Sequence, residues 1–82
     1  MKARVHIFYK DSVFDPQGNT VAESLRRMGF KDVQNVRVGK VVDIYFEKGT
    51  PSQANRDLQK MCSELLANPV IESFKYEVEE GP

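Results

Sequence analysis

Apolar and polar residues alternate with a period of two through the first positions of the chain. Such alternation is typical of a β-strand that buries one face, because successive side chains of a strand point to opposite sides. The pattern therefore predicts a strand over residues 2–9. The side expected to face a core carries Ala3, Val5, Ile7 and Tyr9, and the other side carries Lys2, Arg4, His6 and Phe8.

The next stretch has helical spacing. Asp15 is a good N-cap residue, and Pro16 follows at the first helical position, where its missing N–H costs nothing. Gly29 is expected to end this helix in a left-handed conformation. Its apolar stripe consists of Val21, Ala22, Leu25 and Met28.

A second helix is marked by the capping box Thr50-Pro51-Ser52-Gln53. It is expected to end at Asn68, because a residue that precedes a proline resists the α conformation. From Val70 the period returns to two, which predicts a last strand. The apolar stripe of the second helix consists of Ala54, Leu58, Met61, Cys62 and Leu65.

The middle segment, residues 33–48, permits two interpretations. Its apolar residues share even numbering, and a two-residue hairpin at Gly39-Lys40 would place a charge on the apolar face, which argues against that hairpin. A three-residue loop over residues 39–41 would keep the parity and give a ferredoxin-like βαββαβ order. One long strand, bent or bulged near Gly39, would keep the parity as well. The even-numbered residues are Val36, Val38, Val42, Ile44 and Phe46, interrupted only by Lys40.

Size bears on this choice. An unbroken strand of about 13 residues would reach roughly 40 Å. A compact domain of this length is only about 30 Å across, with a radius of gyration of about 12 Å. A long strand would therefore overhang its own core, and the overhang would need a partner. We favour the long bent strand.

Together these elements predict an α+β fold in one domain spanning residues 1–82. The expected architecture is a two-layer sandwich related to the ferredoxin-like fold. An antiparallel three-stranded sheet, in βαβαβ order with a long bent middle strand, carries two helices on one face. Its other face is left uncovered. Apolar residues with the parity of that outer face predict a face for self-association into a dimer or tetramer, and they are Phe8, Val41, Tyr45 and Ile71.

Charge and composition narrow the function classes. The 82 residues include 12 basic and 12 acidic side chains, so the formal net charge is zero, which disfavours nucleic acid as a partner. No apolar run approaches the roughly 20 residues that span a bilayer. The first residues run directly into the strand pattern and leave no apolar signal region, so a cytoplasmic location is expected.

Candidate chemistry is sparse. Cys62 lies on the apolar stripe of the second helix, where a buried thiol is inert, and His6 lies on the outer side of the first strand. One cysteine and one histidine predict neither a catalytic pair nor a metal site. Gly39-Lys40 lacks the spacing of a phosphate-binding loop. Arg37 and Lys40 have the better claim to function, as contacts to another subunit.

Four motifs in register resemble the PurS family, the small accessory subunit of phosphoribosylformylglycinamidine synthase. The resemblance covers essentially the whole chain without large insertions. The motifs are Asp-Pro-Gln-Gly at 15–18, Arg-Val-Gly-Lys at 37–40, Met61-Cys62, and Leu-Leu-Ala-Asn-Pro-Val-Ile-Glu at 65–72.

The resemblance implies a non-catalytic role in an enzyme complex of purine biosynthesis. In that complex a large synthetase subunit, PurL, uses ATP and Mg, and a glutaminase subunit, PurQ, releases ammonia from glutamine. The small subunit dimerises, docks on the large one and supports ammonia transfer, with no cofactor of its own. An ACT-like domain that binds a small regulatory molecule is the alternative, and an RNA-binding sheet of the RRM type is disfavoured by the absent basic charge.

Carried over to this chain, the motifs imply structural and docking positions. Asp15 and Pro16 would set the first helix, Gly18 would have a structural or docking role, and Gly39 would permit a bend. Asn68 and Pro69 would fix the turn into the last strand. Arg37 and Lys40 would contact another subunit.

Overall fold

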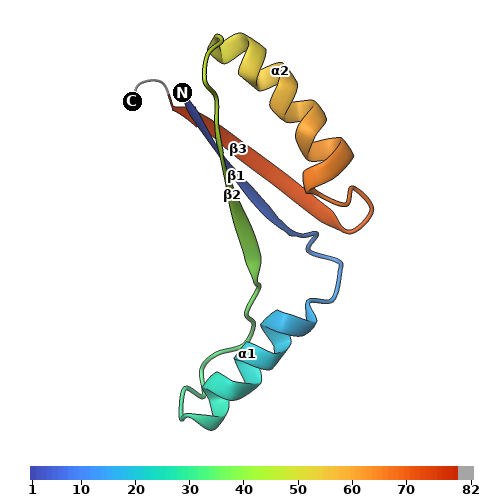
Figure 1. The fold of residues 1–82 in the computed structure, drawn as a ribbon. Helices are drawn as coiled ribbons and strands as arrows, with labels where there is room; N and C mark the ends of the chain where they lie inside the picture. Colours follow the sequence, from blue (N-terminus) through green and yellow to red (C-terminus); the bar gives the residue numbers. More distant parts are fainter. Residues whose placement is uncertain (80–82) are drawn as a thin grey trace.

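The structure is a computed structural model that describes residues 1–79. Its elements follow the order strand, helix, strand, helix, strand (Figure 1). They are β1 (Lys2–Tyr9), α1 (Pro16–Arg27), β2 (Gly39–Tyr45), α2 (Pro51–Met61), a π-helical turn (Cys62–Leu66) and β3 (Glu72–Glu79).

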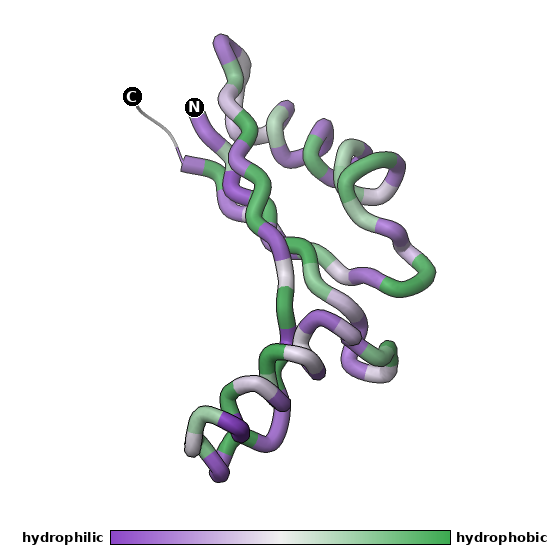
Figure 2. The backbone as a smooth tube through the Cα atoms, turned by 60° about the horizontal axis from the view of Figure 1, so that its bottom comes forward, coloured by the Kyte–Doolittle hydropathy of each residue, from purple (hydrophilic) through white to green (hydrophobic). Residues whose placement is uncertain are grey.

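The sheet has the strand order β2-β1-β3, and both pairings are antiparallel. Apolar and polar positions alternate along the strands (Figure 2). In the central strand β1, the inward side chains Ala3, Val5 and Ile7 are at most 1% exposed, which confirms the period-two prediction. The predicted α+β class with an antiparallel three-stranded sheet is therefore confirmed.

Helix α2 closes the core over this sheet. Its capping box is formed as predicted, and the completely buried Leu58 and Cys62 pack against β1. Burial on this scale stabilises the fold by about 1.5–3 kcal/mol for each large apolar side chain. The same burial raises the pKa of the Cys62 thiol, in keeping with an inert core cysteine.

The end of α2 differs from the prediction at Leu65, which is 82% exposed instead of facing the core. The cause is the π-helical turn, in which Ala67 N donates to the carbonyl of Cys62 five residues back, at 3.0 Å. The wider turn adds residues per revolution, so the apolar stripe shifts and Ala67 takes the buried position.

The last strand begins two residues later than predicted, at Glu72. The Asn68 side chain accepts a hydrogen bond from Val70 N at 3.0 Å, and the Asn68 carbonyl accepts one from Glu72 N at 2.7 Å. These bonds hold residues 68–71 in a turn, and they leave Val70 76% exposed instead of inward. The predicted role of Asn68-Pro69 at this junction agrees with the turn.

The predicted placement of both helices on one face of the sheet is wrong. Within residues 1–79, only α2 packs over the sheet, and α1 extends beyond the end of the strands (Figure 1). We call the sheet with α2 the head, and α1 with residues 28–38 the arm. The molecule measures 49 × 29 × 14 Å, and its radius of gyration is 16.3 Å, well above the compact value of about 12 Å.

The middle segment follows one continuous path with no hairpin at Gly39, so the long-strand interpretation is the better one. Its ladder is nevertheless shorter than predicted. Pairing with β1 starts only at Gly39, and residues 33–38 form no strand with any part of residues 1–79. They run alongside α1, where Arg26 Nε donates to the Val33 carbonyl at 3.0 Å. This contact helps to hold α1 beside residues 33–38.

Candidate functional site

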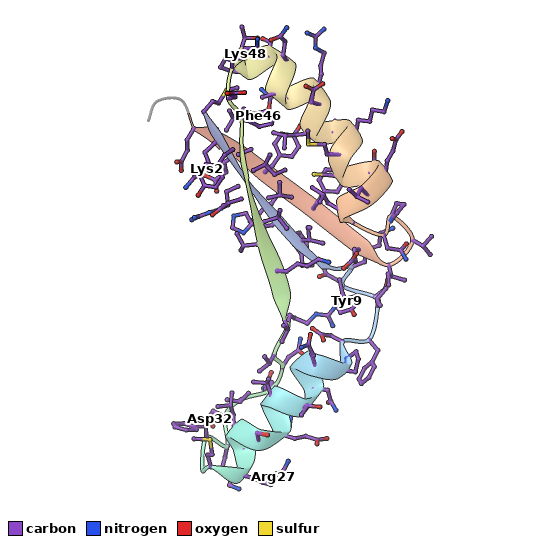
Figure 3. The ribbon with its side chains drawn as sticks, in the orientation of Figure 1. Lys2, Tyr9, Arg27, Asp32, Phe46 and Lys48 are labelled. Atoms are coloured by element: carbon purple, nitrogen blue, oxygen red, sulfur yellow. The ribbon has the colours of Figure 1, made fainter. Side chains whose placement is uncertain are left out.

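Two of the predicted motifs meet where the arm leaves the head. One segment, residues 10–18, connects β1 to α1 and includes the first turn of that helix, and the other, residues 36–39, leads from the arm into β2. We call these two segments together the elbow. Figure 3 shows the separation that the elbow spans: Arg27 and Asp32 lie at the far end of the arm, and Lys2 and Phe46 lie at the opposite end of the head.

The carboxylate of Asp15 ties the two segments of the elbow together. One oxygen, Oδ1, accepts a hydrogen bond from Gly18 N at 2.9 Å, which caps α1 as predicted. The other, Oδ2, accepts from Val38 N at 2.7 Å. Asp15 is only 3% exposed, and the bond from Gly18 N, followed by that from Val38 N, holds its pKa below the usual value. A single buried anion thus starts the helix and anchors the strand.

Both predicted glycines of the elbow are required by close approach. A Cβ atom on Gly18 would overlap the carbonyl oxygen of Val36, and one on Gly39 would lie 2.8 Å from the carbonyl oxygen of Ile7. Neither glycine has a positive φ, so space is the constraint at both positions. By contrast, Gly29 has a φ of 109°, which confirms the predicted left-handed end of α1.

Arg37, predicted as a contact to another subunit, is engaged within the protomer. Its Nη2 donates to the carbonyl oxygens of Lys10 and Val13, both at 2.9 Å. Lys10 N in turn donates to the Ile71 carbonyl at 2.9 Å. The 37–40 and 65–72 motifs are therefore linked through the backbone of Lys10. This link could not be predicted from the sequence, because every residue has a backbone carbonyl group.

Lys40, the other predicted contact, is exposed. The position has the inward parity of β2, and the register opposes it to Ile7 near the end of β1. Within residues 1–79 its ammonium group forms no ion pair. Lys40 thus remains available to a partner, whereas Arg37 holds the elbow.

The predicted dimer face divides into two parts. Phe8 is a diagonal neighbour of Val41, because the register opposes His6 to Val41 and Phe8 to Gly39. Ile71, just before β3, borders the same end of the sheet. Tyr45 lies at the other end, opposite Lys2.

Polar contacts between charged or titratable side chains lie beside and between the two parts. Arg4 donates to Asp43 through two bonds of 2.9 and 3.1 Å, and these bonds lower the pKa of Asp43. Lys2 and Glu79 form an ion pair at 3.8 Å in the same row as Tyr45, and His6 Nε2 lies 3.5 Å from Glu77. The outer face is therefore apolar at its elbow end, and polar groups follow from there to Tyr45.

The geometry offers no support for a catalytic pair. His6 lies on the outer side of the sheet and Cys62 lies in the core on the other side, so the sheet separates them. In the part of the chain that the structure describes, no three side chains of the metal-binding types come together. No helix among residues 1–79 is long and apolar enough to cross a membrane.

Comparison with known proteins decides the family. The family model PurS, described as phosphoribosylformylglycinamidine (FGAM) synthase, matches residues 2–80. The chain belongs to the PurS family. The PurS subunit of Bacillus subtilis FGAM synthase is 45% identical, over 96% of this chain and 93% of that protein. The PurS subunit from Methanocaldococcus jannaschii is 37% identical, over 95% and 94% of the two chains.

Solved structures of PurS confirm the fold. The B. subtilis PurS structure aligns with a TM-score of 0.86 at 43% identity, covering 96% of this chain and 98% of that one. A structure of PurLQS from Thermotoga maritima contains a chain that aligns with a TM-score of 0.82 at 32% identity, over 93% of both chains. These matches favour PurS over the ACT-like alternative.

The first prediction concerns Gly18. In an open helical position, glycine to alanine stabilises by roughly 0.5–1 kcal/mol. Gly18→Ala should instead destabilise the protein by about 3 kcal/mol, because its methyl group would displace the Val36 backbone. Urea unfolding measures the difference, and Ser24→Ala on the exposed side of α1 is the control. A more stable Gly18→Ala protein would show that the arm does not pack this closely.

The second prediction concerns pH. The pKa of Asp15 is lower in the folded than in the unfolded chain, so its ionised form stabilises the fold above the unfolded-state pKa of about 3.9. This contribution is lost as the pH falls through the folded-state pKa. In urea unfolding at a series of pH values, the stability difference between wild type and Asp15→Asn should therefore narrow below about pH 4. A difference independent of pH would contradict the role of the charge.

Proposed function

We propose that this chain is the non-catalytic assembly subunit of a cytoplasmic FGAM synthase complex in purine biosynthesis. In this proposal it bridges the synthetase subunit PurL and the glutaminase subunit PurQ, and supports the transfer of ammonia between them. ATP, Mg and glutamine are used by the complex and not bound by this chain. The observation that carries the proposal is the match to the PurS family and to a chain of the PurLQS structure.

The geometry supports a role in assembly. A catalytic subunit needs converging reactive groups, whereas the polar side chains of the elbow form hydrogen bonds to the backbone of the same chain. The surfaces left for partners are the arm, the unpaired edge of β2 and the uncovered outer face of the sheet.

The arm also supports self-association. Its helix leaves Val21 41% and Met28 70% exposed, so the predicted apolar stripe is only partly covered within the protomer. Residues 34–37 pair with no strand within residues 1–79, and β2 is an edge strand. A second copy satisfies both needs if the long middle segments of two chains pair antiparallel about a twofold axis near Gly39.

Such pairing places Val36 and Val38 on the same side as Val42 and Ile44 of the partner's strand, because all four share parity. The arm helix of each copy then covers the free part of the other copy's inner face, beside α2. The two helices per sheet that the sequence predicts are thereby restored between two chains.

The third prediction tests this self-association. Val21→Asp with Met28→Asp should convert the wild-type dimer into a monomer, because two carboxylates would be buried against the partner. The comparison variant, Val41→Asp with Tyr45→Asp, changes the outer face that the sequence also predicts for dimerisation. Light scattering gives the mass of each. If only the outer-face variant dissociates, the contact lies there and not on the arm.

The fourth prediction tests the function. The purified synthetase and glutaminase subunits from the same organism should form a stable, glutamine-dependent FGAM synthase only when this chain is added. Gel filtration and FGAM formation from glutamine are the readouts, with FGAM formation from free ammonia as the control, because ammonia bypasses the glutaminase. Full glutamine-dependent activity without the chain would overturn the proposal.

A further inference from the structure

A groove runs along the flank of α2 that faces β2. It consists of two hollows, of about 710 and 280 Å³, which both border Asp57. The larger lies at the start of the helix, beside Phe46 just past the end of β2 (Figure 3). The opposite flank of α2 faces β3, because Tyr76 Oη donates to the Asn55 carbonyl and to Gln59 Oε1, both at 3.3 Å. We call the two hollows the α2 groove, and its main lining residues are Met1, Phe46, Gln53, Asp57, Met61 and Leu65.

The α2 groove contains apolar side chains that the protomer leaves uncovered. Leu65 lines the smaller hollow and is 82% exposed, and Met61 beside it is only half-buried. Leu65 points away from its own core because of the π-helical turn, and such turns frequently occur at functional sites. A leucine held outward in this way is explained if a second surface covers it.

The arm carries a matching apolar surface. Val21 and Met28 of its apolar stripe are largely exposed. The helix lies on the inward side of residues 33–38, where Val36 and Val38 are half-buried and share the parity of the inward residues of β2. An arm brought to a second copy by pairing of the middle segments therefore arrives on the inner face, where the α2 groove lies.

The proposed pairing also determines how far the arm reaches. Antiparallel pairing about Gly39 sets Val33 of one chain opposite Tyr45 of the other, because the two are equally distant from the axis. Arg26 Nε donates to the Val33 carbonyl, so the last turn of α1 comes to the level of residues 45–48 of the second chain. The larger hollow lies at that level. Since α1 runs outward from the elbow and α2 runs back towards it, the two helices would be antiparallel.

We infer that the α2 groove is the binding site for α1 of a second copy of this chain, with Met28 of that copy in the larger hollow. Val21 of the same helix lies along the smaller hollow, beside Met61 and Leu65. The inference rests on the self-association in the proposed function, and it adds the site on each head and the residues that fill it. Each protomer provides one groove and one helix, so the dimer contains the same contact twice. The outer face of the sheet stays free.

A designed disulfide tests the position of the arm. Met28→Cys with Gln53→Cys should give a covalent dimer after mild oxidation, because a disulfide forms only when the two Cα atoms lie within about 7 Å. Within one chain the end of α1 and the start of α2 lie at opposite ends of the molecule, so this bridge has to join two copies (Figure 1). The control is Met28→Cys with Gln59→Cys, on the flank of α2 that faces β3. We expect at least about tenfold more covalent dimer from the first pair on a non-reducing gel.

A second test needs no new bond. Leu65→Glu changes the α2 groove, whereas Val70→Glu changes a side chain of similar exposure, 76%, outside it. Both side chains are exposed in the protomer, so neither change removes a core contact. Light scattering over a dilution series should show a dimer dissociation constant raised at least about tenfold by Leu65→Glu and unchanged by Val70→Glu.

The outcomes separate this inference from the proposed function. If the wild-type protein is a dimer and the Gln59 pair cross-links as well as the Gln53 pair, or neither does, the inference alone is overturned. Equal effects of the two glutamate changes also overturn it. A monomeric wild type overturns the self-association together with the inference, whereas the assembly role is tested separately by reconstitution with the synthetase and glutaminase subunits.

Discussion

The structure depends on one carboxylate shared between two connections. Asp15 lies after β1 and accepts hydrogen bonds from the start of α1 and from the residue before β2. Such charge-assisted bonds are short and directional, so they fix the two backbone segments relative to each other. The close packing that they impose explains why Gly18 faces a backbone carbonyl. The direction of the arm follows from these few contacts.

The consequence is a molecule in two unequal parts. The head has a core of its own, in which β1 and α2 bury side chains completely. The arm buries little beyond Gly18 and Ala22, and its Met28 and Phe30 remain more than half exposed. A chain of 82 residues that leaves this much apolar surface open gains stability by associating, because binding to the folded form shifts the folding equilibrium.

Much of this could be predicted from the sequence wherever the signal is local. The alternation in β1, the caps at Asp15 and Thr50, and the end of α1 at Gly29 each depend on neighbouring residues. The position of α1 could not be predicted, since an apolar stripe shows that one face needs a cover and not which sheet supplies it. The exposure of Leu65 could not be predicted, because a π-helical turn has no characteristic residue pattern.

Within the elbow, the sequence predicted the N-cap role of Asp15. Gly18 and Gly39 are required by close approach to backbone carbonyls, a role different from the bend predicted at Gly39. Arg37 donates hydrogen bonds to the backbone carbonyls of Lys10 and Val13. The side chains at those two positions give no indication of this contact. The sequence motifs predicted membership of the PurS family, and the comparisons confirmed it.

The free edge of β2 and the extended run before it have one more consequence. In the proposed dimer, each chain carries both halves of the same pairing, one on either side of Gly39. If the two halves engaged two different neighbours, association would continue into an open filament, whereas reciprocal exchange closes at two copies. In the proposed dimer, the second contact returns to the first chain only if the arm points in the right direction. Asp15 and Arg37, which fix that direction, would then determine whether assembly closes at two copies.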